Sequence, residues 1–542
     1  MSDEDSEQRI RSVVKDCVHC GFCLPACPTY QLWGEEMDSP RGRIYLVSEL
    51  LDGAPLTPAA SEHFDRCLGC MACMTACPSG VQYDQIIEAA RDWTEAGASP
   101  FTVDSPGSGA EDARVAVVEG ADAGIDAGAG TAGAATGARA GARADVRAGA
   151  RPTSQRPVRD RVTRESIFAL FPYPKRLRLA TAPLRLLQKT GADRLIARTG
   201  LVGRVSPAAE QALRLAPPQS RPLPPGRFPE RVAARGERRA VVGMLTGCVQ
   251  SVFFPRVNAA TARVLAAEGC DVVIPRSQGC CGALSLHSGR AAEAAGFARR
   301  AIETFEAAEV DAIVVNSAGC GSAMKEYERL FADDPPWQAR AAALSAKVRD
   351  LAEYLDELGP AAARRPVEVT AAYHDACHLG HAQRVTAAPR SLLRAIPGLE
   401  LVELADAGMC CGSAGVYNLL QPDPARELGS RKADSVVASG ASLLISANPG
   451  CTLQISSELA ARGVHLRTAH TAEILDASLN GVPLGLRGLR GGDGEDRRGR
   501  AALGGAGDGR GAARGARGDQ GCDVAGAGRG QGRGGRPGEA VR

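Results

Sequence analysis

The chain has 542 residues, enough for three or four domains with their own hydrophobic cores, so it does not need disulfides to fold. Its 64 basic and 62 acidic residues nearly cancel, which excludes a strong positive electrostatic field that would attract nucleic acid. Aromatic residues make up 4% of the chain, which leaves few side chains for stacking on bases. No stretch approaches the roughly 18 apolar residues that a membrane-spanning helix needs. The first residues, MSDEDSEQRI, lack the apolar core of a secretory signal. We therefore expect a cytoplasmic protein, in which close-set cysteines are metal ligands or redox thiols.

Residues 1–100 carry the same cysteine motif twice, C-x2-C-x2-C-x3-C-P, at 17–28 and at 67–78. Residues 41–53 and 81–93 have the apolar periodicity of helices. We therefore expect a mainly helical domain whose loops carry the thiols.

The spacing within these motifs is typical of iron–sulfur ligation. Two-residue spacers let three thiolates reach three irons of one cube, and in two-cluster ferredoxins the fourth cysteine ligates the other cluster. Zinc is the alternative, but its ligands usually form two pairs with a longer spacer. The sequence thus predicts two [4Fe–4S] clusters and electron transfer. The predicted ligands are Cys17, Cys20, Cys23 and Cys77 for one cluster (the first cysteine set) and Cys67, Cys70, Cys73 and Cys27 for the other (the second cysteine set).

Three regions lie outside the cysteine-rich parts. Residues 101–160 are rich in Gly and Ala and are expected to be a disordered linker. Residues 161–236 predict short helices followed by a Pro-rich connector, and residues 486–542 predict a disordered Gly/Arg-rich tail, with RNA binding as the alternative. The linker contains a G-x-G-x-x-G pattern that we interpret as chance, because no helix with an acidic residue beyond it completes a βαβ unit: Gly128, Gly130 and Gly133.

Residues 237–360 (the first repeat) and 366–485 (the second repeat) share one order of alternating strands and helices. The expected strands are 240–248, 271–275 and 311–320 in the first repeat, and 369–377, 399–404 and 442–451 in the second. This alternation predicts an α/β domain with a mainly parallel sheet, occurring twice. The fold class predicted for the whole chain is therefore multidomain, α followed by α/β.

The cysteines follow the same repeat. Cys248, Cys280 and Cys320 are matched after 129, 130 and 131 residues. In both copies a cysteine is expected where a strand ends, the edge at which open α/β sheets bind ligands. The candidate redox residues or additional cluster ligands are Cys248, Cys280, Cys281, Cys320, Cys377, Cys410, Cys411 and Cys451. A cluster, a thiol-exchange site and buried structural thiols remain open, and adjacent cysteines in regular structure cannot both face one metal.

Three histidines surround the first cysteine of the second repeat, in the string HDACHLGH. His374, His378 and His381 could be ligands, a proton relay or polar surface residues, and the last interpretation is favoured for each one singly. Cys270 has no counterpart in the second repeat, where Leu399 stands, so we expect it in the core.

With these motifs in this order, the chain resembles the iron–sulfur subunit of bacterial glycolate oxidase. The resemblance covers residues 1–100 and 161–480, and it is carried by strings such as CVHCGFCLPACPTYQLWGEEMDSPRGRIYL, DRCLGCMACMTACPSGVQY, GCCGALSLH and MCCGSAGVYNL. It implies an oxidoreductase complex that converts glycolate to glyoxylate. FAD would be bound by partner subunits and not by this chain, which would pass electrons to a membrane acceptor, a quinone, from a peripheral position at the inner face of the membrane.

One departure limits this resemblance. In the related heterodisulfide reductase and lactate-utilisation proteins, the CCG motif ends in C-x2-C and can hold an unusual cluster. Here the endings are CGSAM (320–324) and CTLQI (451–455), which lack the last thiol. Only the eight N-terminal cysteines are therefore carried over as ligands. The alternative functions are electron transfer in lactate or glycerol-3-phosphate oxidation, and disulfide reduction through the CCG cysteines.

Overall fold

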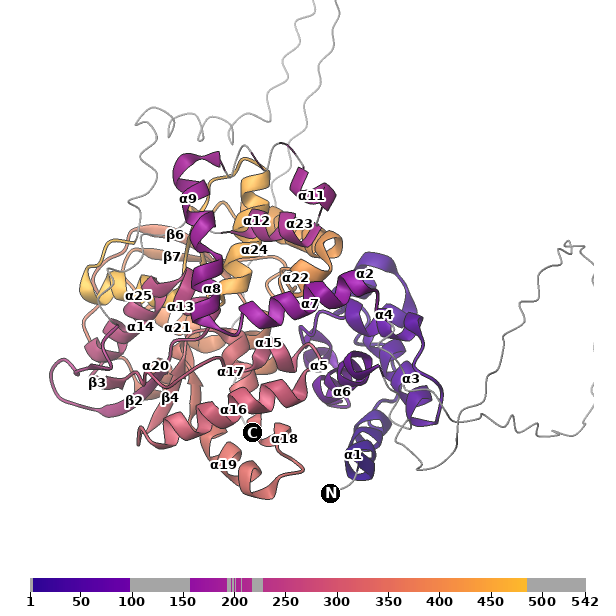
Figure 1. Cartoon of the computed structure of the whole chain (residues 1–542). Coiled ribbons are helices and arrows are strands. Elements are labelled where there is room, and N and C mark those ends of the chain that lie inside the picture. Colours follow the sequence, from indigo (N-terminus) through magenta and orange to yellow (C-terminus); the bar gives the residue numbers. More distant parts are fainter. Residues whose placement is uncertain are drawn as a thin grey trace, which may run out of the picture. The chain divides into compact units, whose positions relative to one another are not determined.

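The structure is a computed structural model, and it describes residues 3–97, 156–192, 196, 199, 201–205, 207–216 and 228–484 (Figure 1). Met1–Leu484 form one compact unit, and the second unit, Gly485–Arg542, lies outside the described residues. The expected tail, most of the expected linker and the glycine pattern at 128–133 therefore also lie outside them.

The N-terminal module is helical, as predicted. The expected helices at 41–53 and 81–93 are confirmed as α3 and α6. Ser39 begins α3 because its side chain accepts a hydrogen bond from the Gly42 amide at 3.0 Å, and Pro40 follows at the first helical position. The core of the module contains Val47, Phe64 and Ala90, all fully buried. Its elements are α1 (Asp3–Lys15), α2 (Pro28–Trp33), η1 (Glu36–Asp38), α3 (Pro40–Leu51), α4 (Pro58–Arg66), α5 (Ala72–Ala76) and α6 (Tyr83–Ala96).

Residues 158–215 contain short helices, and most of the expected Pro-rich connector lies outside the described residues. Helix α7 begins at Val158. Arg164 on α7 pairs with Asp65 at 3.2 Å and so attaches this region to the N-terminal module. The described helices are α7 (Val158–Leu170), α8 (Pro174–Ala180), α9 (Ala182–Thr190), α11 (Leu201–Val205) and α12 (Pro207–Leu215).

The sheets of the two repeats share four corresponding parallel strands. In the first repeat the strand order is β1-β3-β2-β4-β5, parallel except for the edge strand β1, and in the second it is β7-β6-β8-β9, all parallel. Strands β3-β2-β4-β5 thus correspond to β7-β6-β8-β9, which confirms the duplicated α/β fold. The strands are β1 (Arg231–Val232), β2 (Ala240–Leu245), β3 (Cys270–Val273), β4 (Ala312–Val315), β5 (Val348–Asp350), β6 (Val369–His374), β7 (Leu399–Glu403), β8 (Leu443–Ser446) and β9 (Arg467–Ala469).

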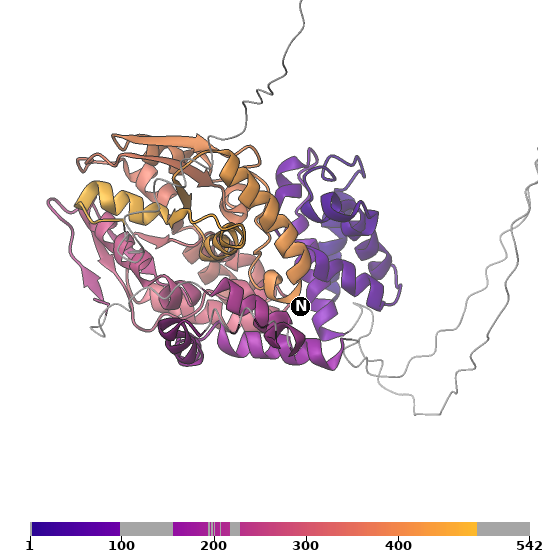
Figure 2. The same cartoon turned by 90° about the horizontal axis from the view of Figure 1, so that it is seen from above.

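Helices connect these strands and pack the repeats together. Val264 and Leu265 on α14 share a hydrophobic core with Ile474 and Leu475 on α25, so the repeats share part of their interior. Figure 2 shows the two repeats side by side from above. In the first repeat the helices are α13 (Val249–Phe253), α14 (Pro255–Ala267), α15 (Ala283–Leu286), α16 (Ala291–Glu306), α17 (Ala318–Lys325), α18 (Tyr327–Leu330), α19 (Pro335–Ser345) and α20 (Leu351–Leu358). In the second they are η2 (His378–Ala382), α21 (Ala387–Arg394), α22 (Tyr417–Leu420), α23 (Pro422–Ala438), α24 (Pro449–Ala461) and α25 (Thr471–Asn480).

Four of the expected strands are too long. Strands β2 and β6 end at Leu245 and His374, three residues before Cys248 and Cys377. Strand β4 ends at Val315 and β8 ends at Ser446, and the chain then turns into α17 and α24. Cys320 and Cys451 therefore lie in the first turn of a helix and not on a strand. They still lie beyond the carboxyl ends of the strands, the edge at which parallel sheets bind ligands.

Candidate metal centres

The first cysteine set surrounds a small cavity in the N-terminal module. Cys17, Cys20, Cys23 and Cys77 all line it, together with Cys73. Left-handed backbone at His19 (φ 52°) and Gly21 (φ 83°) curls the loop so that three of its cysteines line one cavity. Cys20 is exposed. Its neighbours Val18 and Phe22 are 67% and 66% exposed, so this site lies at an apolar part of the surface.

The second cysteine set surrounds another cavity, which is lined by Cys27, Cys67, Cys70 and Cys73. All four of these cysteines are buried. The backbone is again left-handed at the matching positions, Gly69 (φ 63°) and Met71 (φ 61°). Cys27 comes from the first motif but lines the cavity of the second, which is the exchange of the fourth cysteine that the spacing predicts.

Buried cations favour the thiolate form of Cys67 in the second set, whereas burial raises the pKa of Cys70 and Cys73 well above its ordinary value. Arg43 is 1% exposed and donates hydrogen bonds to the His63 carbonyl at 2.7 Å and to Asp38 Oδ1 at 3.3 Å. Burial alone would raise the pKa of the Cys67 thiol, but the guanidinium groups of Arg43 and Arg91 lower it below its ordinary value. The Gly69 amide also donates a hydrogen bond to Cys67 Sγ at 3.3 Å. Because thiolate is the form that binds metal, this environment suits a metal ligand.

Each of the two cavities thus gathers the four thiols of one predicted set. Four close-set cysteine sulfurs are the donors that a [4Fe–4S] cluster takes, so the residues present fit two such clusters. Ligation of iron by these eight cysteines stays a prediction.

A third cavity, of about 330 Å³, lies between the two repeats and is lined by all eight CCG-repeat cysteines. In the first repeat Cys280 Sγ donates a hydrogen bond to Cys248 Sγ at 3.5 Å, and Cys281 interacts with Cys320. The two adjacent cysteines line one cavity because their loop is not regular structure: Gly282, which follows them, has φ 83°.

The second repeat holds its four sulfurs in the same way. Cys377 Sγ donates a hydrogen bond to Cys410 Sγ at 3.9 Å, and Cys411 interacts with Cys451. The hydrogen bond with Cys410, together with burial, raises the pKa of the Cys377 thiol well above its ordinary value. The hydrogen bond with Cys248 and burial have the same effect on Cys280, despite an opposing contribution from Cys281. Both shifts favour the thiol form of these residues over the thiolate.

The three predicted histidines have different environments. His381 Nδ1 lies 2.9 Å from Thr75 Oγ1 and its Nε2 lies 2.8 Å from the Gly408 carbonyl oxygen, so it links the N-terminal module to the second repeat. His378 Nδ1 lies 3.6 Å from Cys377 Sγ. His374 is fully buried at the end of β6, so the favoured interpretation as a surface residue is wrong for it. The string HDACHLGH gave no sign of this, because burial there depends on the packing of the whole repeat. Cys270 is fully buried, as expected.

The second cysteine set is in contact with the second repeat. Cys70 packs in one hydrophobic cluster with Cys377, Cys410 and Tyr417. The carboxyl edge of the second sheet therefore lies beside the buried cysteine set of the N-terminal module.

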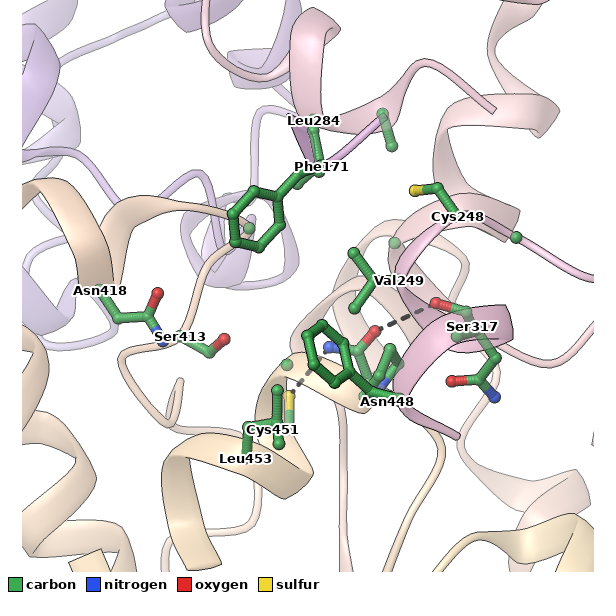
Figure 3. A pocket seen from close by; sticks show the side chains of 18 of the residues that line it. Phe171, Cys248, Val249, Leu284, Ser317, Ser413, Asn418, Asn448, Cys451 and Leu453 are labelled. Atoms are coloured by element: carbon green, nitrogen blue, oxygen red, sulfur yellow. Dashed lines mark hydrogen bonds between the residues drawn. The ribbon is translucent and has the colours of Figure 1, made fainter. Parts of the chain in front are cut away.

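Nothing in the sequence indicates that the short helices of 158–215 line the third cavity. Leu170, Phe171, Leu177 and Leu215 supply an apolar wall. Figure 3 shows Phe171 together with Leu284, and Asn448 beside Cys451. Apolar side chains in these helices resemble ordinary core residues, so only the fold reveals which surface they cover.

Three family descriptions match parts of the chain. "4Fe-4S dicluster domain" matches residues 13–81, "Glycolate oxidase iron-sulfur subunit, linker region" matches 159–216, and "Cysteine-rich domain" matches 242–325 and 371–456. The structure and these matches together confirm a helical iron–sulfur domain followed by two CCG domains.

Curated relatives match over most of the chain. The "Probable glycolate oxidase iron-sulfur subunit" of Bacillus subtilis is 33% identical over 490 residues, 88% of this chain and 96% of the relative. The "Glycolate oxidase iron-sulfur subunit" of Escherichia coli is 31% identical, covering 82% of this chain and 90% of the relative. "Lactate utilization protein A" of an Exiguobacterium species is 36% identical, but over only 43% of this chain and 96% of the relative. Among the described residues, no helix combines the length and apolar character required to cross a bilayer.

Proposed function

Because the chain belongs to the family of glycolate oxidase iron–sulfur subunits, we propose that it transfers electrons in a flavin-dependent complex that oxidises glycolate to glyoxylate. The observation that supports this role best is the grouping of eight cysteines around two neighbouring cavities, with Cys27 and Cys77 exchanged between the motifs. In this proposal the first cysteine set holds one [4Fe–4S] cluster and the second holds another. Such clusters accept and release single electrons at potentials set by their surroundings.

The chain's own residues would give the two sites different roles. At the first site, the exposed Cys20 lies between Val18 and Phe22, whose large exposed apolar side chains suit the docking of a partner subunit. At the second site, the thiols are buried, and Arg43 and Arg91 compensate negative charge. The partners in this proposal are FAD-binding subunits and a membrane acceptor, a quinone. The chain would work in the cytoplasm, held at the inner face of the membrane through the complex.

Lactate oxidation is the second candidate, because the lactate utilization relative matches 43% of the chain. The glycolate oxidase relatives match 82–88% of it, which favours glycolate. Glycerol-3-phosphate oxidation has no such match among the relatives named above.

Disulfide reduction through the CCG cysteines is less well supported. A thiolate is the nucleophile in that chemistry. The pKa of Cys280 is well above its ordinary value, through its hydrogen bond with Cys248 and its burial, and the pKa of Cys281 is also raised.

The test uses the complete complex, purified without oxygen, with and without this chain. Omission of the chain should abolish glycolate-dependent reduction of a quinone and spare reduction of a soluble dye by the flavin subunits. Unchanged quinone reduction would refute the proposal. The same assay with lactate and glycerol-3-phosphate separates the substrate alternatives. Disulfide turnover that disappears in a Cys280→Ala, Cys281→Ala variant with intact N-terminal clusters would instead support the reductase.

A further inference from the structure

The second repeat contains a buried histidine that lacks hydrogen-bond partners. His374 is fully buried at the end of β6, and neither Nδ1 nor Nε2 has a hydrogen-bond partner among the described residues. Buried polar side chains are nearly always hydrogen-bonded, and an exception calls for a physical explanation such as a missing ion.

Two cysteines lie beside this imidazole. Cys411, from the CCG loop, and Cys451, from the first turn of α24, join His374 in a group whose ligand atoms all lie within 4.8 Å of one another. Three separate segments of chain thus bring one imidazole nitrogen and two cysteine sulfurs close together. Imidazole and thiolate together are the ligands preferred by Zn²⁺ and by iron.

A neighbouring side chain supports one of the sulfurs. Asn448 Nδ2 donates a hydrogen bond to Cys451 Sγ at 3.3 Å, as the dashed line in Figure 3 shows. Such outer partners commonly orient metal ligands and stabilise thiolate. Cys411 and Cys451 also line the third cavity, so this point can be reached from that cavity.

The first repeat lacks this nitrogen. Strand β2 ends at Leu245 and its counterpart β6 ends at His374, the same offset of 129 residues that separates Cys248 from Cys377. The matching thiols Cys281 and Cys320 are present in the first repeat, so the histidine is the chemical difference between the two arrangements.

We propose that His374, Cys411 and Cys451 bind one divalent transition-metal ion, Zn²⁺ or Fe²⁺, in the second repeat only. Two thiol protons leave to solvent on binding, and the two thiolates balance the charge of the ion. The site goes beyond the proposed function, because it uses none of the eight N-terminal cysteines.

The test uses the full chain purified without oxygen, with its N-terminal iron and acid-labile sulfide measured and intact. Metal analysis of this protein shows whether iron or zinc is present beyond the N-terminal clusters. Zn²⁺ is then added, excess is removed, and bound zinc is counted and examined by X-ray absorption at the zinc edge, where iron does not interfere. The variants are His374→Leu, which copies the residue of the first repeat, and Cys451→Ser. Cys320→Ser in the first repeat is the matched control.

Wild type and Cys320→Ser should each bind one more equivalent of metal than His374→Leu and Cys451→Ser do. The additional ion should be coordinated by both nitrogen and sulfur. Metal should also raise the unfolding temperature of wild type but not of His374→Leu. In the absence of metal, His374→Leu should unfold no earlier than wild type, because the imidazole it removes makes no hydrogen bond to the described residues. Equal metal content and an equal nitrogen contribution in wild type and His374→Leu would overturn the proposal.

Discussion

Arg43 shows how a single buried charge can hold the second cysteine set in place. Besides Asp38 and the His63 carbonyl, its guanidinium contacts Thr29 Oγ1 at 3.2 Å, so it ties α3 to the segment that follows the first motif and to the helix that precedes the second. A buried guanidinium with several partners is costly to remove, because its partners then stay buried without compensation.

We predict that Arg43→Met lowers the free energy of unfolding by about 3–5 kcal/mol and raises the pKa of Cys67. Denaturant unfolding measures the first effect, and the pH dependence of Cys67 alkylation in protein freed of iron measures the second. The control is Arg431→Met, which removes an exposed pair with Glu427 and should cost about 0.5 kcal/mol or less. A loss for Arg43→Met as small as that of the control would contradict this role.

The exchange of Cys27 between motifs can be tested by pairing substitutions. Cys27→Ala should remove about half of the iron. Adding Cys70→Ala should remove no more, because both cysteines belong to the second set, whereas adding Cys20→Ala should remove nearly all of it. Iron and sulfide analysis after anaerobic purification measures this, with Cys270→Ala as the buried cysteine that should keep both clusters. The reverse pattern for the two double variants would show that Cys27 serves the cluster of its own motif.

At the scale of residues, the sequence predicted which cysteines would group: the short spacers bring three of each set together within one loop, and the ferredoxin pattern assigns the fourth to the other motif. It could not predict Arg43 or His374. Their importance depends on partners far away in the chain, and nothing in RGRIYL or HDACHLGH distinguishes them from surface residues.

Among the helices, α25 is capped by a histidine that must be neutral. His470 Nδ1 accepts a hydrogen bond from the Ala472 amide at 3.0 Å, and its Nε2 donates to the Asn316 carbonyl of the first repeat at 2.9 Å. Burial lowers the pKa of His470 to about 4. The unfolded chain therefore takes up this proton at higher pH than the folded chain does.

The resulting stabilisation, up to about 3 kcal/mol, should be complete above about pH 6.5 and be lost as the pH falls from 6.5 to 4. Asparagine also caps helices, so His470→Asn should keep α25. Between pH 4 and 6.5, unfolding of this variant should take up about one proton fewer than unfolding of the wild type, and its unfolding free energy should depend less steeply on pH. Unfolding free energies measured between pH 4 and pH 8 for the two proteins test this. Parallel curves would refute the role of His470.

The elements were predictable where periodicity is local, as in α3, α6 and the repeated strands and helices. The strand ends were not. The apolar run through DAIVVNSAGC does not reveal that pairing stops at Val315, since that depends on where the neighbouring strand stops. The role of α7, α8 and α12 as a wall of the third cavity also depends on tertiary packing.

Across the whole molecule, the N-terminal module is fitted closely onto the first repeat. Arg91 on α6 donates a hydrogen bond to the His287 carbonyl at 2.7 Å. Gly289, with φ 78°, lies so close that a Cβ there would be 2.2 Å from the Arg91 carbonyl oxygen. A side chain at this position would have to displace the backbone of α6.

We predict that Gly289→Ala loosens this contact and speeds hydrogen exchange in α6 at least tenfold, which corresponds to about 1.4 kcal/mol. Gly236→Ala is a close control, because Gly236 also has φ 78° but a Cβ there would meet nothing within 4 Å. The control carries the same backbone strain and should leave exchange in α6 unchanged. Equal protection of α6 in both variants would mean that this contact does not hold the module.

Cys70 of the N-terminal module packs against Cys377 and Cys410 of the second repeat, so the two repeats are not equivalent in their surroundings. In the first repeat, the corresponding thiols Cys248 and Cys280 pack instead with Tyr173 and Phe297. Suppose the two halves exchanged places along the polypeptide. Each would keep its sheet and its thiols, yet Cys248 and Cys280 would then lie beside Cys70 in place of Cys377 and Cys410. The two repeats share one strand order, but the N-terminal module packs against the thiols of only one of them, so the two cysteine sites have different surroundings within the same scaffold.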